Sequence, residues 1–337
     1  MKYAPHWLVG LAAASGSLLW AQVTQFHGPI LHDTSPHTIQ FITVENDVKL
    51  EVLDWGGSGR PVVLLTGYGN DAHIYDQFAP KLTGAYHVYG ITRRGFGGSS
   101  VPAATGNAYD TDRLGDDVLA VMAALKLNKP VLVGHSIAGE ELSSVGSRHP
   151  EKVSGLIYLD AAGSYAFYDR ERGDFNLDWK DIQQKVEQIK GAPGAFPSVI
   201  QELLDTSLPA LERDLRDAQK TWGALPEASR PAPLPLPIPG LLAVLIAGGH
   251  KYTNIPVPIL AIFAVPGDFG PIAAPGDPLS REALDAMRAA IEAQAKAVER
   301  GLPTAHVVRI PNADHYVFQS NESDVLREMN AFIGSLP

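Results

Sequence analysis

Short apolar runs rich in β-branched residues alternate along this chain with longer segments of helical periodicity. Residues 62–66 and 131–134 are two such runs, and residues 111–125 between them place apolar side chains on one helical face. A strand that is apolar along its whole length must be buried on both faces, which favours a mostly parallel sheet covered by helices. The fold class is therefore predicted as α/β. Further strands are expected over residues 39–44, 49–55, 87–91, 153–160, 259–264 and 306–310, and further helices over 72–82, 137–149, 176–190, 198–222, 279–300 and 323–333.

Composition excludes several classes of protein. The chain has 337 residues with 45% hydrophobic content, which is enough for a sizeable core and argues against disorder. The formal net charge is −10, and no run of Lys and Arg offers the basic face that nucleic acid requires. Cysteine is absent, so disulfides, thiolate nucleophiles and cysteine-based metal sites are excluded.

The N-terminus has the pattern of a bacterial secretory signal peptide. Lys2 precedes an uncharged, mostly apolar run over residues 7–20, and Ala21 offers a small residue for cleavage. Fourteen residues are short for a bilayer core of about 30 Å, so an uncleaved anchor is the weaker alternative. We expect residues 1–21 to be removed, the protein to be periplasmic or extracellular, and no stable membrane span to remain.

One long stretch interrupts the alternation of strands and helices. About a hundred residues between Asp160 and Ile259 hold no clear core strand, and prolines recur at nearly every second position of residues 230–240. Long insertions in compact domains are usually lids, although a solvated excursion without function is the alternative. We predict a core over residues 37–163 and 256–337 and a cap over residues 164–255.

The segment G-H-S-I-A-G, residues 134–139, joins an expected strand to an expected helix. It is a G-x-S-x-A variant of the nucleophile elbow, a tight turn that holds a serine hydroxyl clear of the sheet. Small residues on either side of Ser136 avoid clashes across the turn, and the following helix directs its N–H groups toward developing negative charge. The alternative is that Ser136 only caps a helix.

Two more segments, in the right order, complete a resemblance. Residues 66–69, T-G-Y-G, and residues 94–99, R-G-F-G-G-S, each follow an expected strand and precede the elbow. With them, the chain resembles the α/β-hydrolase superfamily over about residues 37–335, in a serine esterase or lipase-like branch with a cap insertion. The resemblance implies an eight-stranded, mostly parallel sheet with a helical cap inserted after the sixth strand.

The resemblance also implies partners for Ser136. His315, in the loop P-N-A-D-H after the last expected strand, matches the family's catalytic base. Asp268, after the strand over residues 259–264, matches the usual orienting acid, and the order Ser136, Asp268, His315 is the family's order. Asp160 is the alternative acid, in a position that some relatives use, followed by Asp277 and Asp314.

The remaining site residues are expected around this triad. The backbone N–H groups of Tyr68 and Ile137 are predicted to form the oxyanion hole. Two acids directly behind the elbow, Glu140 and Glu141, need partners if buried, and Arg93 and Arg94 are the candidates. We expect these acids to bond a neighbouring loop or solvent, with a role in the site as the alternative. Substrate contacts are predicted for Tyr68, His135, Phe167 and Trp222. The alternative for Phe167 and Trp222, which lie in the predicted cap, is that they form the cap's own core.

These residues predict a serine hydrolase that cleaves a small-molecule carboxylic ester through an acyl-enzyme, with no cofactor and no metal. The alternatives on the same triad are a proline-iminopeptidase-like peptidase, a carbon–carbon bond hydrolase and a haloperoxidase-like enzyme. The peptidase would need cap acids to hold a substrate amine. A different class is a non-catalytic ligand receptor with the same fold, against which the complete triad argues. The cap acids that the peptidase alternative would use are Asp169, Glu171, Asp174 and Asp178.

Overall fold

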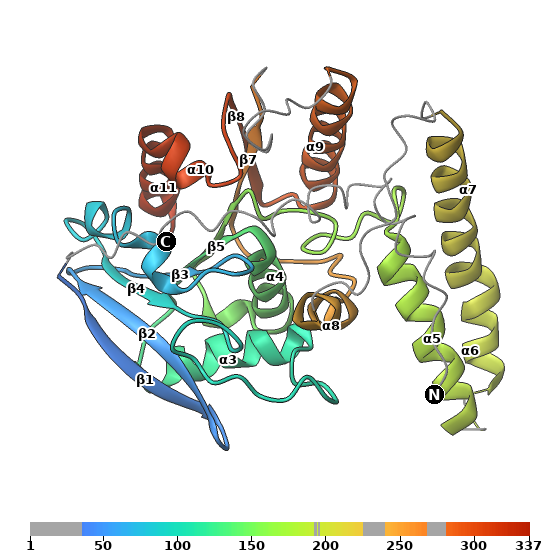
Figure 1. Cartoon of the computed structure of the whole chain (residues 1–337), viewed down its shortest axis with the longest axis horizontal. Coiled ribbons are helices and arrows are strands. Elements are labelled where there is room, and N and C mark those ends of the chain that lie inside the picture. The colour runs from blue at the N-terminus through green and yellow to red at the C-terminus, as the bar shows by residue number, and fades with distance from the viewer. Residues whose placement is uncertain (1–35, 192–193, 195, 225–239, 268–280) are drawn as a thin grey trace.

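The computed structural model describes residues 36–191, 194, 196–224, 240–267 and 281–337. Eight strands form one sheet in the order β1-β2-β4-β3-β5-β6-β7-β8, with helices on both sides (Figure 1). The predicted α/β fold with an eight-stranded, mostly parallel sheet is confirmed. The strands are β1 (Thr38–Glu45), β2 (Val48–Gly56), β3 (Pro61–Leu65), β4 (His87–Ile91), β5 (Val131–His135), β6 (Gly155–Leu159), β7 (Ile259–Val265) and β8 (Ala305–Pro311).

The pairing pattern determines where a site can form. β2 runs antiparallel to its neighbours β1 and β4, and the six strands from β4 to β8 in the sheet order are parallel. β5 and β6 lie in the middle and every residue of both is buried. Because parallel strands end at one edge of the sheet, the segments after β3, β5, β6 and β8 can meet there.

Each face of the sheet is covered by its own set of helices. Leu132 of β5 packs with α3 (Thr111–Ala124), α4 (Gly139–Arg148) and α9 (Arg281–Gly301). Val133 packs on the other face with α10 and α11. Neighbouring strand residues point to opposite faces, so burial on both explains the uninterrupted apolar runs. The second face is covered by η3 (Ala72–Tyr75), η4 (Ala79–Lys81), α10 (Val317–Ser320) and α11 (Glu322–Ser335).

Two predicted helices take a different form. Residues 72–82, expected as one helix, form the separate 3-10 turns η3 and η4. Residues 198–222, also expected as one helix, form α6 (Phe196–Glu202), a π-helical turn η8 (Leu203–Ser207) and α7 (Leu208–Ala224). A proline stands near each break, Pro80 in η4 and Pro209 at the start of α7, and proline has no N–H for a helical hydrogen bond.

The segment between β6 and β7 contains no described strand, and most of its described residues lie in helices. α5 (Phe175–Gly191) contacts α6, η8 and α7, and these helices lie to one side of the sheet (Figure 1). α8 (Gly240–Gly248) contacts α5, and its Leu245 belongs to the same apolar cluster as Leu114 of α3. The division into a core over residues 37–163 and 256–337 and a cap over residues 164–255 remains a prediction. The predicted signal peptide, residues 1–21, falls outside the described residues. Among the described helices, none combines the length and apolar character that a membrane span needs.

Candidate active site

Ser136 occupies a sharp turn between β5 and α4. Its φ is +54°, in the left-handed region that few residues other than glycine adopt, and it begins the short 3-10 turn η5 (Ser136–Ala138). A Cβ on Gly134 would come within 2.9 Å of the Leu142 side chain, and a Cβ on Gly139 would collide with the carbonyl oxygen of Ala161. The two glycines therefore permit the close approach of strand and helix that this turn requires.

The loop after β3 passes directly over this turn. A Cβ on Gly67 would lie 3.2 Å from Ser136 Cβ and 2.8 Å from His135 Nδ1, so only glycine fits there. The Asn70 N–H donates to the Gly67 carbonyl at 3.3 Å and closes the loop into a turn. Tyr68, the next residue, is thereby held beside the serine by backbone geometry.

His315 follows β8 and is fixed by the residue next to Ser136. His135 Nε2 donates to the His315 carbonyl oxygen at 2.8 Å, and the centroids of the two imidazoles lie 4.6 Å apart. His135 is 1% exposed, and burial lowers its pKa well below the usual value, so it is held as a neutral imidazole. This placement gives His135 a positioning role and does not favour the predicted contact with substrate.

The carboxylate behind His315 is Asp160. Its Oδ2 accepts from His315 Nδ1 at 2.7 Å, and its Oδ1 accepts from the Ala264 N–H at 3.0 Å. Asp160 follows β6 directly with a φ of +48°, and that bend at the strand's end carries the carboxylate toward β7. The predicted acid, Asp268, lies outside the described residues, and among the described residues the alternative Asp160 occupies its expected place.

The proton positions follow from these contacts. Nδ1 of His315 carries a hydrogen because it faces a carboxylate, so Nε2 of the neutral ring has the free lone pair. This Nε2 is buried and has no hydrogen-bond partner among the described residues. An imidazole in this tautomer, with Asp160 at Nδ1 and His135 bound to the backbone carbonyl of the same residue, is the arrangement that a general base for a serine hydroxyl needs.

A sequence model of the alpha/beta hydrolase fold matches residues 60–219, which include β3, the elbow and β6. The chain has the α/β-hydrolase fold. It is 30% identical to a fluoroacetate dehalogenase from Burkholderia sp over 152 residues, 44% of this chain and 50% of that protein. It is 29% identical to a pimeloyl-[acyl-carrier protein] methyl ester esterase from Aeromonas hydrophila over 181 residues, 52% and 64% respectively.

A crystal structure of a bromoperoxidase from Bacillus anthracis covers 88% of this chain, and all of that chain, with a TM-score of 0.54 and 17% identity. At that identity the likeness shows the fold alone. Several of the curated relatives are matched over only about half of their length. The names of these relatives span different reactions, so the fold alone does not choose among substrates.

The two acids behind the elbow have separate environments. Glu141 forms a buried pair with Arg93, whose Nη2 donates to Glu141 Oε2 at 2.9 Å and to the Thr66 carbonyl at 3.1 Å. Glu140 accepts from Thr111 Oγ1 at 3.2 Å. Burial, reinforced by the neighbouring Glu141 charge, raises the pKa of Glu140 to about 8. Of the two candidate partners, Arg93 and Arg94, it is Arg93 that pairs with Glu141.

Arg94 has a different partner. Its Nε and Nη2 donate to the two oxygens of Asp117 at 2.7 and 2.6 Å, and its Nη1 donates to the Ala108 carbonyl. Asp117 lies on α3, so this buried pair joins the loop after β4 to that helix. The loop carrying Phe96 is thereby held next to the elbow.

An apolar cluster lies beside Ile137, the residue that follows the serine. Tyr68 and Phe96 meet edge to face with ring centroids 5.4 Å apart, and α8 contributes Leu241 and Leu245. The predicted substrate residue Tyr68 belongs to this cluster. Phe167 instead packs against Gly301 of α9 in the main core, and the side chain of Trp222, within α7, lies outside the described part of the chain.

Proposed function

We propose that this protein is a serine hydrolase that cleaves carboxylic esters through an acyl-enzyme intermediate. The observation that carries the proposal is the clamp on His315, between Asp160 Oδ2 at Nδ1 and His135 at the backbone, next to a serine in the elbow conformation. A protein that only binds a ligand has no need for this set of contacts.

The roles follow from the geometry. Ser136 Oγ attacks the ester carbonyl carbon while His315 Nε2 takes its proton, and the resulting imidazolium is stabilised by Asp160. The tetrahedral intermediate collapses, and the leaving alkoxide takes that proton from His315 and departs as the alcohol. Water activated by the same Nε2 then attacks the acyl-enzyme and releases the carboxylate and Ser136.

The oxyanion hole is assigned to the backbone N–H groups of Tyr68 and Ile137. Gly67 brings the loop against Ser136 Cβ, and Ile137 stands at the start of the helical segment. Such donors stabilise charge that develops only in the transition state, worth roughly 3 kcal/mol each. Because the donors belong to the backbone, changing the side chain of Tyr68 leaves its N–H in place.

The apolar cluster beside Ile137 favours an ester with an apolar group. Tyr68, Phe96 and Leu241 are only partly buried and carry no charge, and Ile137 of the same cluster directly follows the nucleophile. An esterase is also among the curated relatives by name. We propose a small-molecule ester as substrate and, from the sequence pattern, export of the protein with cleavage after residue 21.

The cap acids do not favour a peptidase. Asp178 is buried between Lys251 at 2.6 Å and Tyr168 at 2.7 Å. Asp169 pairs with Arg300 at 2.9 Å, and Glu171 lies 3.5 Å from the same guanidinium. Asp174 accepts from the Ser164 hydroxyl at 2.6 Å. Each acid that a peptidase would need for a substrate amine thus has a partner within the protein itself.

The test is pre-steady-state hydrolysis of p-nitrophenyl esters of graded acyl length, with the matching p-nitroanilides as controls. Wild type should release a burst of about one equivalent of p-nitrophenol, and Ser136→Ala should release none. The esters should turn over far faster than the anilides. Anilide hydrolysis that matches ester hydrolysis, or an unchanged burst in Ser136→Ala, would contradict the proposal.

A further inference from the structure

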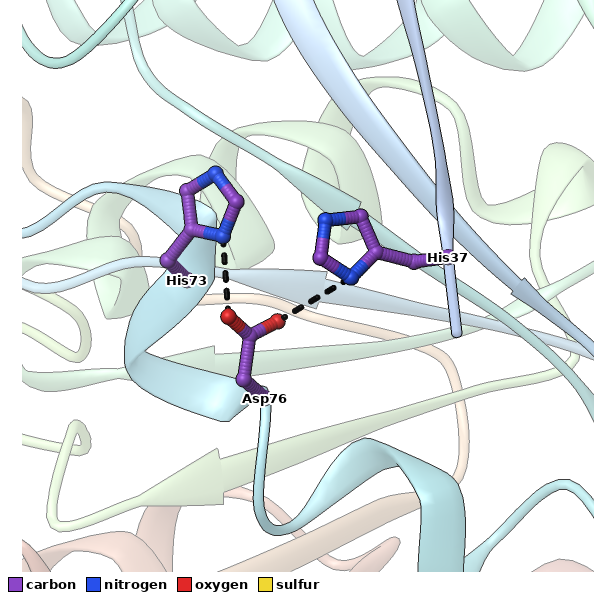
Figure 2. A group of neighbouring side chains, drawn as sticks. All are labelled: His37, His73 and Asp76. Carbon is purple, nitrogen blue, oxygen red and sulfur yellow. Dashed lines mark hydrogen bonds and ion pairs between the residues drawn. The ribbon is translucent and has the colours of Figure 1, made fainter. Parts of the chain in front are cut away.

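Two histidines and an aspartate meet at the edge of the sheet, away from the residues assigned to catalysis. His37 precedes β1, His73 lies in η3, and Asp76 follows η3 directly. Figure 2 shows the Asp76 carboxylate between the two imidazoles, with one oxygen toward each ring. One ligand atom from each residue lies within 4.8 Å of the other two. Segments 36 residues apart in sequence thus bring three metal-ligating groups together.

The carboxylate is buried and only half satisfied. Asp76 is 2% exposed, and its Oδ2 pairs with His73 Nδ1 at 2.9 Å. Its Oδ1 faces His37 Nδ1 at 3.5 Å, and neither of these two buried atoms makes a hydrogen bond among the described residues. Asp76 pairs with no Lys or Arg in the described ranges. A buried carboxylate oxygen without a partner is costly, so this group favours a cation.

We propose that His37, His73 and Asp76 bind a divalent transition metal ion of the Zn²⁺ type. Imidazole nitrogen and carboxylate oxygen are ligands that Zn²⁺ takes at about 2.0–2.2 Å. Two such ligands on a tetrahedral ion stand about 3.4 Å apart, close to the spacing of His37 Nδ1 and Asp76 Oδ1. Three protein ligands leave the fourth position for water.

A second group of similar composition provides a contrast. Asp110, Asp112 and His250 also lie within metal-ligating distance of one another. There, however, Asp110 accepts from His250 at 2.8 Å and lies 3.7 Å from Lys180. Asp112 Oδ1 accepts hydrogen bonds from Ser144 and Tyr252 at 2.7 Å. Those carboxylates already have donors, so the proposal is confined to the first group.

The ion would connect two parts of the structure. His37 directly precedes the edge strand β1, whereas η3 follows the loop of residues 67–70 that lies over Ser136. Asp71 accepts from the His73 N–H at 3.1 Å and so couples the metal-binding turn to the end of that loop. The ion would therefore fasten the N-terminal strand to the segment behind the proposed oxyanion loop without contacting substrate.

The test is metal titration of the full-length protein produced without a polyhistidine tag. Co²⁺ absorption in the visible region reports ordered coordination, and displacement by Zn²⁺ gives the affinity for Zn²⁺. Wild type should take up one equivalent. His37→Ala and Asp76→Asn should each weaken binding at least tenfold, and the matched control His250→Ala should bind as wild type does.

A folding readout covers the case in which a variant is unstable. Excess Zn²⁺ should raise the melting temperature of wild type and His250→Ala but not that of Asp76→Asn, whose side chain keeps its shape. His73→Ala should behave like Asp76→Asn. Binding that survives both His37→Ala and Asp76→Asn, binding lost in His250→Ala, or no uptake by wild type would each overturn the proposal.

Discussion

At the scale of single residues, the central question is which carboxylate orients His315. Asp160 Oδ2 lies 2.7 Å from His315 Nδ1, and Asp160 is itself fixed by the Ala264 N–H. The single N–H at Nδ1 of His315 can donate a good hydrogen bond to only one carboxylate. Asp160 therefore fills the position for which the sequence favoured Asp268.

Asp160→Asn should lower kcat/KM for an ester substrate by about 10⁴-fold, because an amide in that position holds the imidazole in the wrong tautomer. Asp268→Asn, the matched control, should change it by less than about tenfold. The measurement is steady-state hydrolysis over a range of pH. If Asp268→Asn were the more damaging of the two, Asp160 would be a structural residue only.

The conformation of Ser136 predicts a stability effect that is separate from activity. A residue with a side chain at φ +54° stores strain of roughly 1–3 kcal/mol, and glycine avoids it. Ser136→Gly should therefore have a free energy of unfolding about 1 kcal/mol higher than Ser136→Ala, although both are inactive. Urea denaturation provides the comparison.

Ser143, in the middle of α4, is the control for that comparison. It is buried and helical, so alanine there should be more stable than glycine by about 1 kcal/mol, the reverse order. If glycine were also the less stable substitution at position 136, the strain at the elbow would be absent.

At the scale of elements, the first turn of α4 carries two buried acids of different character. Glu141 has the Arg93 guanidinium, whereas Glu140 has one hydroxyl partner, and its pKa is raised to about 8. Glu140 is therefore protonated in the folded protein at pH 6 while the same group is ionised in the unfolded chain. Stability supplied by this group is present at low pH and is lost as pH rises toward 8.

Glu140→Gln should flatten that pH dependence. The side chain keeps its shape but cannot ionise, so the loss of unfolding free energy between about pH 5 and pH 8 should shrink, by up to about 1.4 kcal/mol per pH unit. Denaturant unfolding at pH 5, 6.5 and 8 measures it. The exposed Glu151→Gln serves as the control and should leave the slope unchanged; an equal effect there would refute the assignment.

The elements themselves were largely predictable from sequence. β3, β5 and β6 are almost entirely apolar, with His135 at the end of β5 as the polar exception, because both faces of the sheet are covered, and that pattern is local. Residues 72–82 were not predictable in this way, because apolar spacing favoured one helix where Pro80 and the packing against the sheet allow only short turns.

At the scale of the whole molecule, the site depends on contacts between distant segments. β6 and β7 are neighbours and end at the same edge of the sheet, so residues after either strand can approach His315. Sequence order alone could not choose between Asp160 and Asp268. The contact between His135 and the His315 carbonyl, 180 residues apart, has no local signal either.

The most direct test of the account is labelling with a fluorophosphonate, followed by mass spectrometry of the modified peptide. We predict one adduct per chain, on Ser136, formed much more slowly in His315→Ala and Asp160→Asn and absent in Ser136→Ala. An adduct on another residue, or labelling of Ser136 at an unchanged rate in both His315→Ala and Asp160→Asn, would contradict the proposal that these three residues act together.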